Sequence, residues 1–105
     1  MTNANHAREQ QVLTMIVGVL RSSSAALAGR RVVLFGSRAR GQARDRSDFD
    51  IGVVGTTPLP LADYYVIEDQ LDALPTLYRI DWVDFARAGD NFRRRALQHT
   101  QVLHG

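Results

Sequence analysis

A glycine–serine pair followed by two closely spaced aspartates is the part of this 105-residue chain whose residue types best support chemistry. Gly36 lets backbone approach a phosphate closely, and Ser37 adds a hydroxyl and an amide at a helix start, where anions are favoured. Asp48 and Asp50 lie two residues apart, so on a strand both point to one side while Phe49 points to the other. The pattern predicts a phosphate cradle beside a pair of metal-binding carboxylates.

Two short apolar segments position these motifs. Residues 31–35 predict a buried strand that runs into Gly36, and residues 51–54 predict a second strand that leaves Asp50. If these strands are antiparallel neighbours, both motifs lie at the same edge of a sheet. The two carboxylates then converge beside the glycine.

A third strand, predicted over residues 77–85, contains two more acids. Because side chains alternate along a strand, Asp81 and Asp84 lie on opposite faces, and only one of them can join the first pair. With Asp81 as the third carboxylate, the three acids can hold the metal ions that compensate charge on a nucleoside triphosphate, and Mg²⁺ is the default ion. Asp81 could also help to activate an attacking hydroxyl.

Helical periodicity and capping residues predict the rest of an α+β domain that spans residues 1–105, with a sheet of at least three strands flanked by helices. Ser37 is the predicted N-cap of a brief helix that ends near Gly41, and Asp90 is the predicted N-cap of the last helix. The longer predicted helices cover residues 7–27, 61–74 and 91–99, and residues 100–103 are expected to be extended.

Composition excludes several classes of chemistry. Cysteine is absent, so thiol nucleophiles, disulfides and thiolate metal sites are excluded. All 13 basic residues are arginine, which leaves phosphate binding to arginine and backbone amides and makes Arg38 and Arg40 candidates. These arginines could equally form a solvated face. The net charge of +2 is too small to indicate nucleic-acid binding, and the three histidines lack metal-ligand spacing.

The N-terminal region superficially resembles a secretion signal, because residues 12–20 are rich in apolar side chains and small residues follow. Arg8 and Glu9 cancel in the basic leader that such a signal needs, and the apolar residues recur on one helical face. No run approaches the roughly 20 apolar residues that span a bilayer. We expect a cytoplasmic protein without a membrane association.

The motifs also resemble a known family. The run GSRARG at 36–41 followed by SDFDI at 47–51 is similar to the signature of polymerase-β-type nucleotidyltransferases, most closely the minimal nucleotidyltransferases, and RIDWV at 79–83 is similar to their third-carboxylate strand. Phe49 and Gly52 depart from the aliphatic residues that are common at these positions. The resemblance implies a polymerase-β-like nucleotidyltransferase fold, with ATP and Mg²⁺ bound by Gly36, Ser37, Arg38, Arg40, Asp48, Asp50 and Asp81.

The same resemblance implies a partner: minimal nucleotidyltransferases are antitoxins of HEPN ribonuclease toxins, and the best-understood members transfer AMP to a toxin tyrosine. The expected protein is therefore an adenylyltransferase in a hetero-oligomer with a HEPN toxin, or a homodimer whose second copy completes the acceptor site. Two alternatives stay open. The chain could be a non-catalytic nucleotide-binding module that occludes its partner, or a nucleotidyltransferase subunit that acts on a small molecule.

Overall fold

The computed structural model describes residues 4–105, which form one four-stranded mixed sheet with helices on both faces. Strand order across the sheet is β3-β2-β1-β4; β1 is antiparallel to β2 and β4, whereas β2 and β3 are parallel. The elements in chain order are α1 (Ala4–Ser22), β1 (Arg31–Phe35), α2 (Gly36–Ala39), β2 (Phe49–Val54), α3 (Leu61–Asp72), β3 (Ile80–Asp84), a 3₁₀ turn η1 (Phe85–Arg87), α4 (Asp90–Ala96) and β4 (Gln101–His104).

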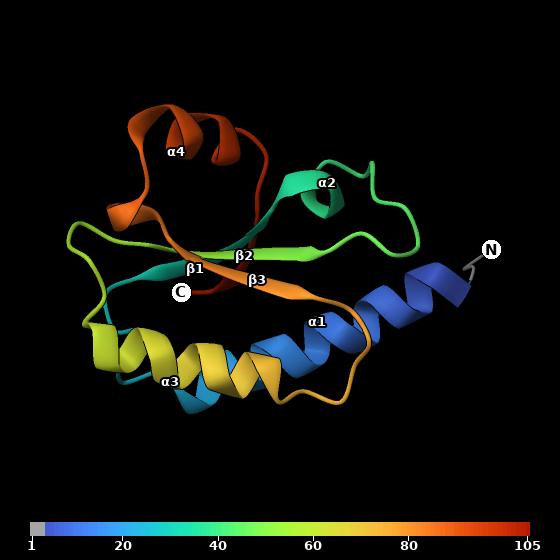
Figure 1. The fold of residues 1–105 in the computed structure, drawn as a ribbon, viewed down its shortest axis with the longest axis horizontal. Helices are drawn as coiled ribbons and strands as arrows, with labels where there is room; N and C mark the ends of the chain where they lie inside the picture. Colours follow the sequence, from blue (N-terminus) through green and yellow to red (C-terminus); the bar gives the residue numbers. More distant parts are fainter. Residues whose placement is uncertain (1–3) are drawn as a thin grey trace.

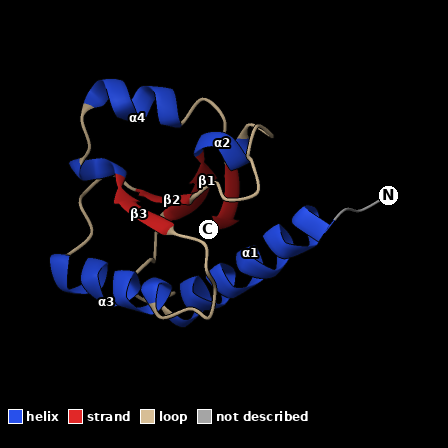
Figure 2. Cartoon of the chain, turned by 45° about the vertical axis from the view of Figure 1, so that its right-hand side comes forward, coloured by secondary structure: helices blue, strands red, loops and turns tan. Residues whose placement is uncertain are grey.

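Two layers of helices enclose the sheet. Helices α1 and α3 lie along one face, and α2 and α4 lie over the other (Figures 1 and 2). The main core fills the α1 and α3 side, where Ile16, Phe49 and Ile51 are completely buried. A smaller cluster on the opposite side is built from Val33, Phe35 and Phe85. The sheet therefore packs apolar residues on both faces.

The alternation of side chains along β2 and β3 decides which acids lie on the face away from the main core. Phe49 and Trp82 are buried on the α1 and α3 side, so Asp50 and Asp81 lie on the other face, as the spacing predicts. Asp84 lies on the buried face instead, where its carboxylate accepts hydrogen bonds from the backbone amides of Leu59 (2.7 Å) and Ala86 (3.0 Å). Asp84 is a structural acid, and Asp81 is the one that faces the second layer.

Gly52 has a packing role that offsets its weak strand propensity. A Cβ at this position would lie 2.1 Å from the ring of Phe85, so only glycine allows that ring to cover β2. The ring of Phe85 then meets Phe35 edge-on, with centroids 5.0 Å apart. The ring of Phe85, from η1, therefore fills the space that an aliphatic side chain at position 52 would occupy.

The predicted fold class and the pairing of the first two strands are confirmed, but several predicted boundaries and caps are wrong. Helix α1 ends at Ser22 and not at residue 27, because a run of serines follows and the chain continues in turns up to Gly29, whose φ is +75°. The caps also differ: Phe35 precedes α2, which starts at Gly36, and Gly89, not Asp90, precedes α4.

The C-terminal segment is extended, as expected, and adds a fourth strand beside β1, which the sequence did not specify. The third strand is shorter than predicted and starts at Ile80. Within residues 4–105, no helix combines the length and the apolar character that crossing a membrane requires.

Candidate active site

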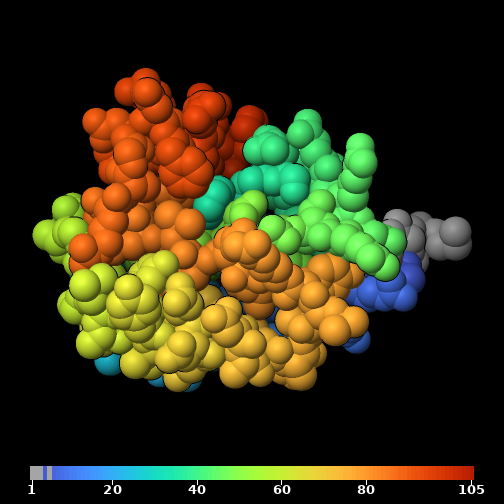
Figure 3. Space-filling view, in the orientation of Figure 1, coloured from blue at the N-terminus to red at the C-terminus, as the bar shows by residue number. Residues whose placement is uncertain are grey.

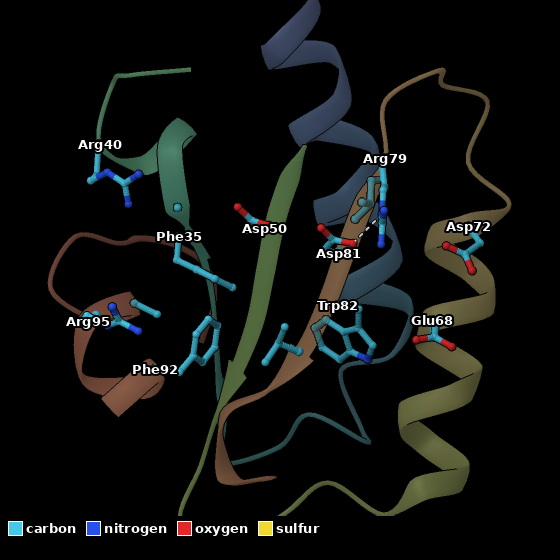
Figure 4. A pocket seen from close by; sticks show the side chains of 14 residues that line it. Phe35, Arg40, Asp50, Glu68, Asp72, Arg79, Asp81, Trp82, Phe92 and Arg95 are labelled. Atoms are coloured by element: carbon cyan, nitrogen blue, oxygen red, sulfur yellow. Dashed lines mark hydrogen bonds and ion pairs between the residues drawn. The ribbon is translucent and has the colours of Figure 1, made fainter. Parts of the chain in front are cut away.

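Three residues in a row across the sheet form the centre of the candidate site. Phe35 of β1 pairs with Asp50 of β2, and Asp50 pairs with Asp81 of the parallel strand β3. All three face the α2 and α4 layer, so the Asp50 and Asp81 carboxyl groups lie close together (Figure 4). This juxtaposition follows from two strands that carry an aspartate at matched register positions.

Gly36 brings backbone against the first of these carboxylates. Its φ of +72° is in the left-handed region, and a Cβ built there would lie 2.2 Å from Oδ2 of Asp50. Any other residue at this position would overlap the carboxylate. The turn between β1 and α2 therefore approaches Asp50 as closely as a backbone can, as a cradle for a phosphate requires.

These residues lie in a cavity of about 1000 Å³, which is the upper end of the roughly 300–1,000 Å³ typical of ligand pockets. The space-filling view shows the surface hollowed between α4 and the α2 region (Figure 3). Four of the seven predicted site residues line the cavity, namely Gly36, Arg40, Asp50 and Asp81; Ser37, Arg38 and Asp48 do not. Its other lining residues are Phe35, Glu68, Asp72, Arg79, Ile80, Trp82, Val83, Phe92, Arg95 and Ala96.

The electrostatics of the acid pair favour a cation. Burial raises the pKa of the Asp50 carboxyl above its ordinary value, and the neighbouring Asp81 and Asp48 carboxylates raise it further, while Arg40 acts in the opposite direction. Arg79 donates from Nε to the Asp81 carboxylate at 2.9 Å, but its side chain is largely exposed. Like charges held together in this way are stabilised by a positive ion that bridges them.

Asp48 lies at the entrance to β2 and is close enough to influence Asp50 electrostatically. Its side chain, however, lines a second cavity bordered by α1 and the segment before β3. Among the described residues, no three His, Cys, Asp or Glu side chains are gathered closely enough to hold a metal by themselves. The described structure thus brings together two of the three predicted carboxylates and leaves the third beside them.

Arg38 occupies a different environment from the one expected of a phosphate ligand. Its guanidinium pairs with Glu9 of α1 at 2.8 Å and donates to the backbone carbonyl of Ser47 at 2.7 and 3.1 Å. The same group stacks over the ring of Phe49, 4.0 Å from its centroid, and lies 5.2 Å from that of Tyr78. With a side chain only 5% exposed, Arg38 fixes the loop that leads into Asp48.

We expect Arg38→Met to destabilise the fold by about 2–3 kcal/mol, because it leaves Glu9 and the Ser47 carbonyl without their buried partner. Urea unfolding followed by circular dichroism measures this free energy. The matched control is Arg40→Met, two residues away on an exposed side chain, which should change stability by less than about 0.5 kcal/mol. Equal stability of both variants would contradict the assigned role of Arg38.

Sequence reasoning missed the cavity's contributions from α3 and α4. Phe92 of α4 is 42% exposed and lines the cavity together with Arg95. Glu68 and Asp72 line the opposite side from α3. The available signal was helical spacing: residues 92, 95 and 96 lie on one side of a helix, as do residues 68 and 72.

The mixed sheet presents paired aspartates beside a glycine turn, which is an arrangement suited to the nucleotidyl transfer that the motifs predict. The family described as "Polymerase beta, Nucleotidyltransferase" matches residues 28–105. The chain belongs to this family, which confirms the recognition made from the motifs and makes the protein a nucleotidyltransferase. Among curated proteins, no significant match was found.

Solved structures with the same fold include toxin–antitoxin complexes. One is a toxin–antitoxin crystal structure with AMP-PNP, at 23% identity and a TM-score of 0.65, covering 89% of this chain and 73% of the other. Another is the tri-AMPylated HEPN toxin of Shewanella oneidensis with an MNT antitoxin, at 21% identity, a TM-score of 0.61 and coverages of 91% and 71%. A putative nucleotidyltransferase from Sulfolobus solfataricus matches at 18% identity, a TM-score of 0.61 and coverages of 97% and 87%.

Proposed function

We propose that this protein transfers AMP from ATP to a hydroxyl group of a partner protein. The observation that carries the proposal is the close approach of Gly36 to Asp50, which pairs with Asp81 across the sheet, so a backbone turn suited to phosphate lies beside two clustered carboxylates. In the reaction, the acceptor oxygen bonds to the α-phosphorus, the bond to the β-phosphate breaks, pyrophosphate leaves and the hydroxyl proton is lost. Asp81 lines the cavity and would be the group that receives this proton.

The donor set fits magnesium. Mg²⁺ is usually held by one or two carboxylates together with water and substrate phosphates, so the Asp50 and Asp81 pair supplies what the ion needs from the protein. Asp48, which already acts on Asp50 electrostatically, would be the third ligand. When bound, the ion would neutralise negative charge on the phosphate oxygens, whereas orientation of the nucleotide would fall to Gly36, Ser37 and the arginines.

We further propose that the acceptor is a tyrosine of a HEPN ribonuclease toxin and that the protein acts as its antitoxin in a cytoplasmic complex. Support comes from the likeness in fold to the structures described as toxin–antitoxin complexes, one of which contains an AMPylated HEPN toxin.

The test is transfer of labelled AMP. The protein is incubated with ATP labelled on its adenosine, Mg²⁺ and the HEPN protein encoded beside it, and the label is located by intact-mass and peptide mass spectrometry. We expect one or more AMP units on a toxin tyrosine, and none with the Asp81→Asn variant. A HEPN protein that carries no label under these conditions would contradict the proposal.

The same experiment separates the alternatives. A toxin that is silenced without any AMP attached, and equally by wild type and Asp81→Asn, indicates a module that acts by occlusion. Label that appears only in a small-molecule fraction indicates a nucleotidyltransferase with a different acceptor. Each result can be distinguished because the toxin's ribonuclease activity and its mass are measured on one sample.

A further inference from the structure

Three consecutive arginines on α4 have three different surroundings. Arg93 donates to the backbone carbonyls of Phe85 (3.0 Å) and Ala88 (3.4 Å) and pairs with Asp90, so it anchors the start of the helix. Arg94 is exposed and lines neither cavity described for residues 4–105. Arg95 lines the cavity that contains the acid pair, and its guanidinium forms no hydrogen bond or ion pair with another described residue.

Aromatic packing fixes the side of α4 that faces the cavity. The ring of Phe92 lies 6.0 Å from those of Phe85 and Phe35, stacked on the first and edge-on to the second. Residues three apart share one side of a helix, so this contact turns Arg95 toward the cavity and Arg94 away from it. Because Phe35 neighbours Asp50 in the sheet, the same aromatic cluster ties the position of Arg95 to the acid pair.

Charge is distributed unevenly in the cavity. Arg40 and Arg95 lie on one side, the Asp50 and Asp81 pair lies in the middle, and α3 presents two acids on the other side (Figure 4). Arg79, the third arginine of the lining, is already paired with Asp81. A triphosphate carries its greatest negative charge at its terminal phosphates, so it is stabilised when that end lies near Arg40 and Arg95 and away from α3.

We propose that Arg95, together with Arg40, binds the β- and γ-phosphates of the nucleotide, the portion that leaves as pyrophosphate. This inference rests on the proposed function and adds a residue from α4 to a site otherwise built from the sheet and α2. Arginine suits the role because its planar guanidinium binds phosphate through two parallel hydrogen bonds. The orientation of the nucleotide follows: its α-phosphate lies at the acid pair and its terminal phosphates lie beneath α4.

Calorimetric binding of a non-hydrolysable ATP analogue, ADP and AMP, each with Mg²⁺, tests the assignment on the full-length protein. For Arg95→Gln, we expect the affinity for the ATP analogue to fall about tenfold, the effect of one charge-assisted hydrogen bond at an exposed site. Affinity for AMP should stay within about twofold. Arg95→Lys should recover part of the loss, because the charge is retained without the paired geometry. The matched control, Arg94→Gln, should bind all three nucleotides as the wild type does.

The outcomes are distinguishable. A lower affinity of Arg95→Gln for the ATP analogue supports the assignment. If the affinity for ADP falls as well, Arg95 contacts the β-phosphate; if it does not, Arg95 contacts the γ-phosphate. Equal affinity of wild type and Arg95→Gln for the ATP analogue overturns it and leaves the proposed function intact, as does an equal loss for all three nucleotides. A wild-type protein that binds none of the nucleotides overturns the proposed function as well. Thermal unfolding of each variant verifies that the fold is retained.

Discussion

Asp50→Asn is expected to lower the rate of AMP transfer by about a thousandfold. The carboxylate lies between Gly36 and Asp81, so its charge is central to holding a cation at the phosphate. Metal-ion stabilisation of phosphoryl-type transfer is worth several kcal/mol, and each 1.4 kcal/mol corresponds to about a factor of ten in rate. Single-turnover transfer of labelled AMP measures the effect. Asp69→Asn, an exposed acid of α3 outside the cavity, is the matched control and should transfer at the wild-type rate.

Asp50→Asn should also be more stable than the wild type at neutral pH in the absence of metal. The pKa of Asp50 is raised in the folded protein, so between the ordinary pKa of 3.8 and the raised one the folded state binds more protons than the unfolded state. Stability of the wild type therefore falls relative to Asp50→Asn as pH rises through this window, and the difference vanishes below it. Thermal unfolding with a chelator, from acid to neutral pH, measures the trend.

The effect of Mg²⁺ on thermal stability should also differ between the wild type and Asp50→Asn. Added Mg²⁺ should raise the melting temperature of the wild type, because a cation offsets repulsion between Asp50 and Asp81, and it should have a smaller effect on Asp50→Asn. A variant that transfers AMP normally, or that is less stable than the wild type at every pH, would contradict the role assigned to this carboxylate.

The faces on which the acids lie were predictable because they depend on strand alternation alone. Asp48 and Asp50 flank an apolar residue, and alternation separates Asp81 from Asp84 onto opposite faces of β3, as the structure shows. The parallel direction of β3 relative to β2, and the position of β4 beside β1, depend on how connections cross the sheet. Local sequence contains no signal for those crossings.

The arginines were not predictable for a related reason. Arg38 and Arg40 are two residues apart at the C-terminal end of α2, yet one is buried against α1 and the other is exposed. The partner that distinguishes them, Glu9, lies 29 residues earlier in the chain, so their difference is a tertiary effect. Arg95 is similar, because its orientation depends on the packing of Phe92 against Phe35 and not on the arginine run itself.

Gly36→Ala is expected to remove most activity through a single methyl group. The new Cβ would lie 2.2 Å from Oδ2 of Asp50, and the φ of +72° is one that alanine adopts at a cost of about 1–3 kcal/mol. Either the turn or the carboxylate must move, and a displacement of about 1 Å in a catalytic constellation can lower a rate about a hundredfold. We therefore expect loss of transfer together with reduced stability.

Gly41→Ala separates the two causes, because Gly41 has nearly the same φ, +70°, but a Cβ there would contact nothing within 4 Å. This variant should lose about the same stability through backbone strain while its transfer rate stays within a few-fold of the wild type. Urea unfolding and single-turnover transfer on both variants make the comparison. If the two substitutions lower the rate equally, the effect is one of backbone strain, and the close approach of Gly36 to Asp50 has no part in the chemistry.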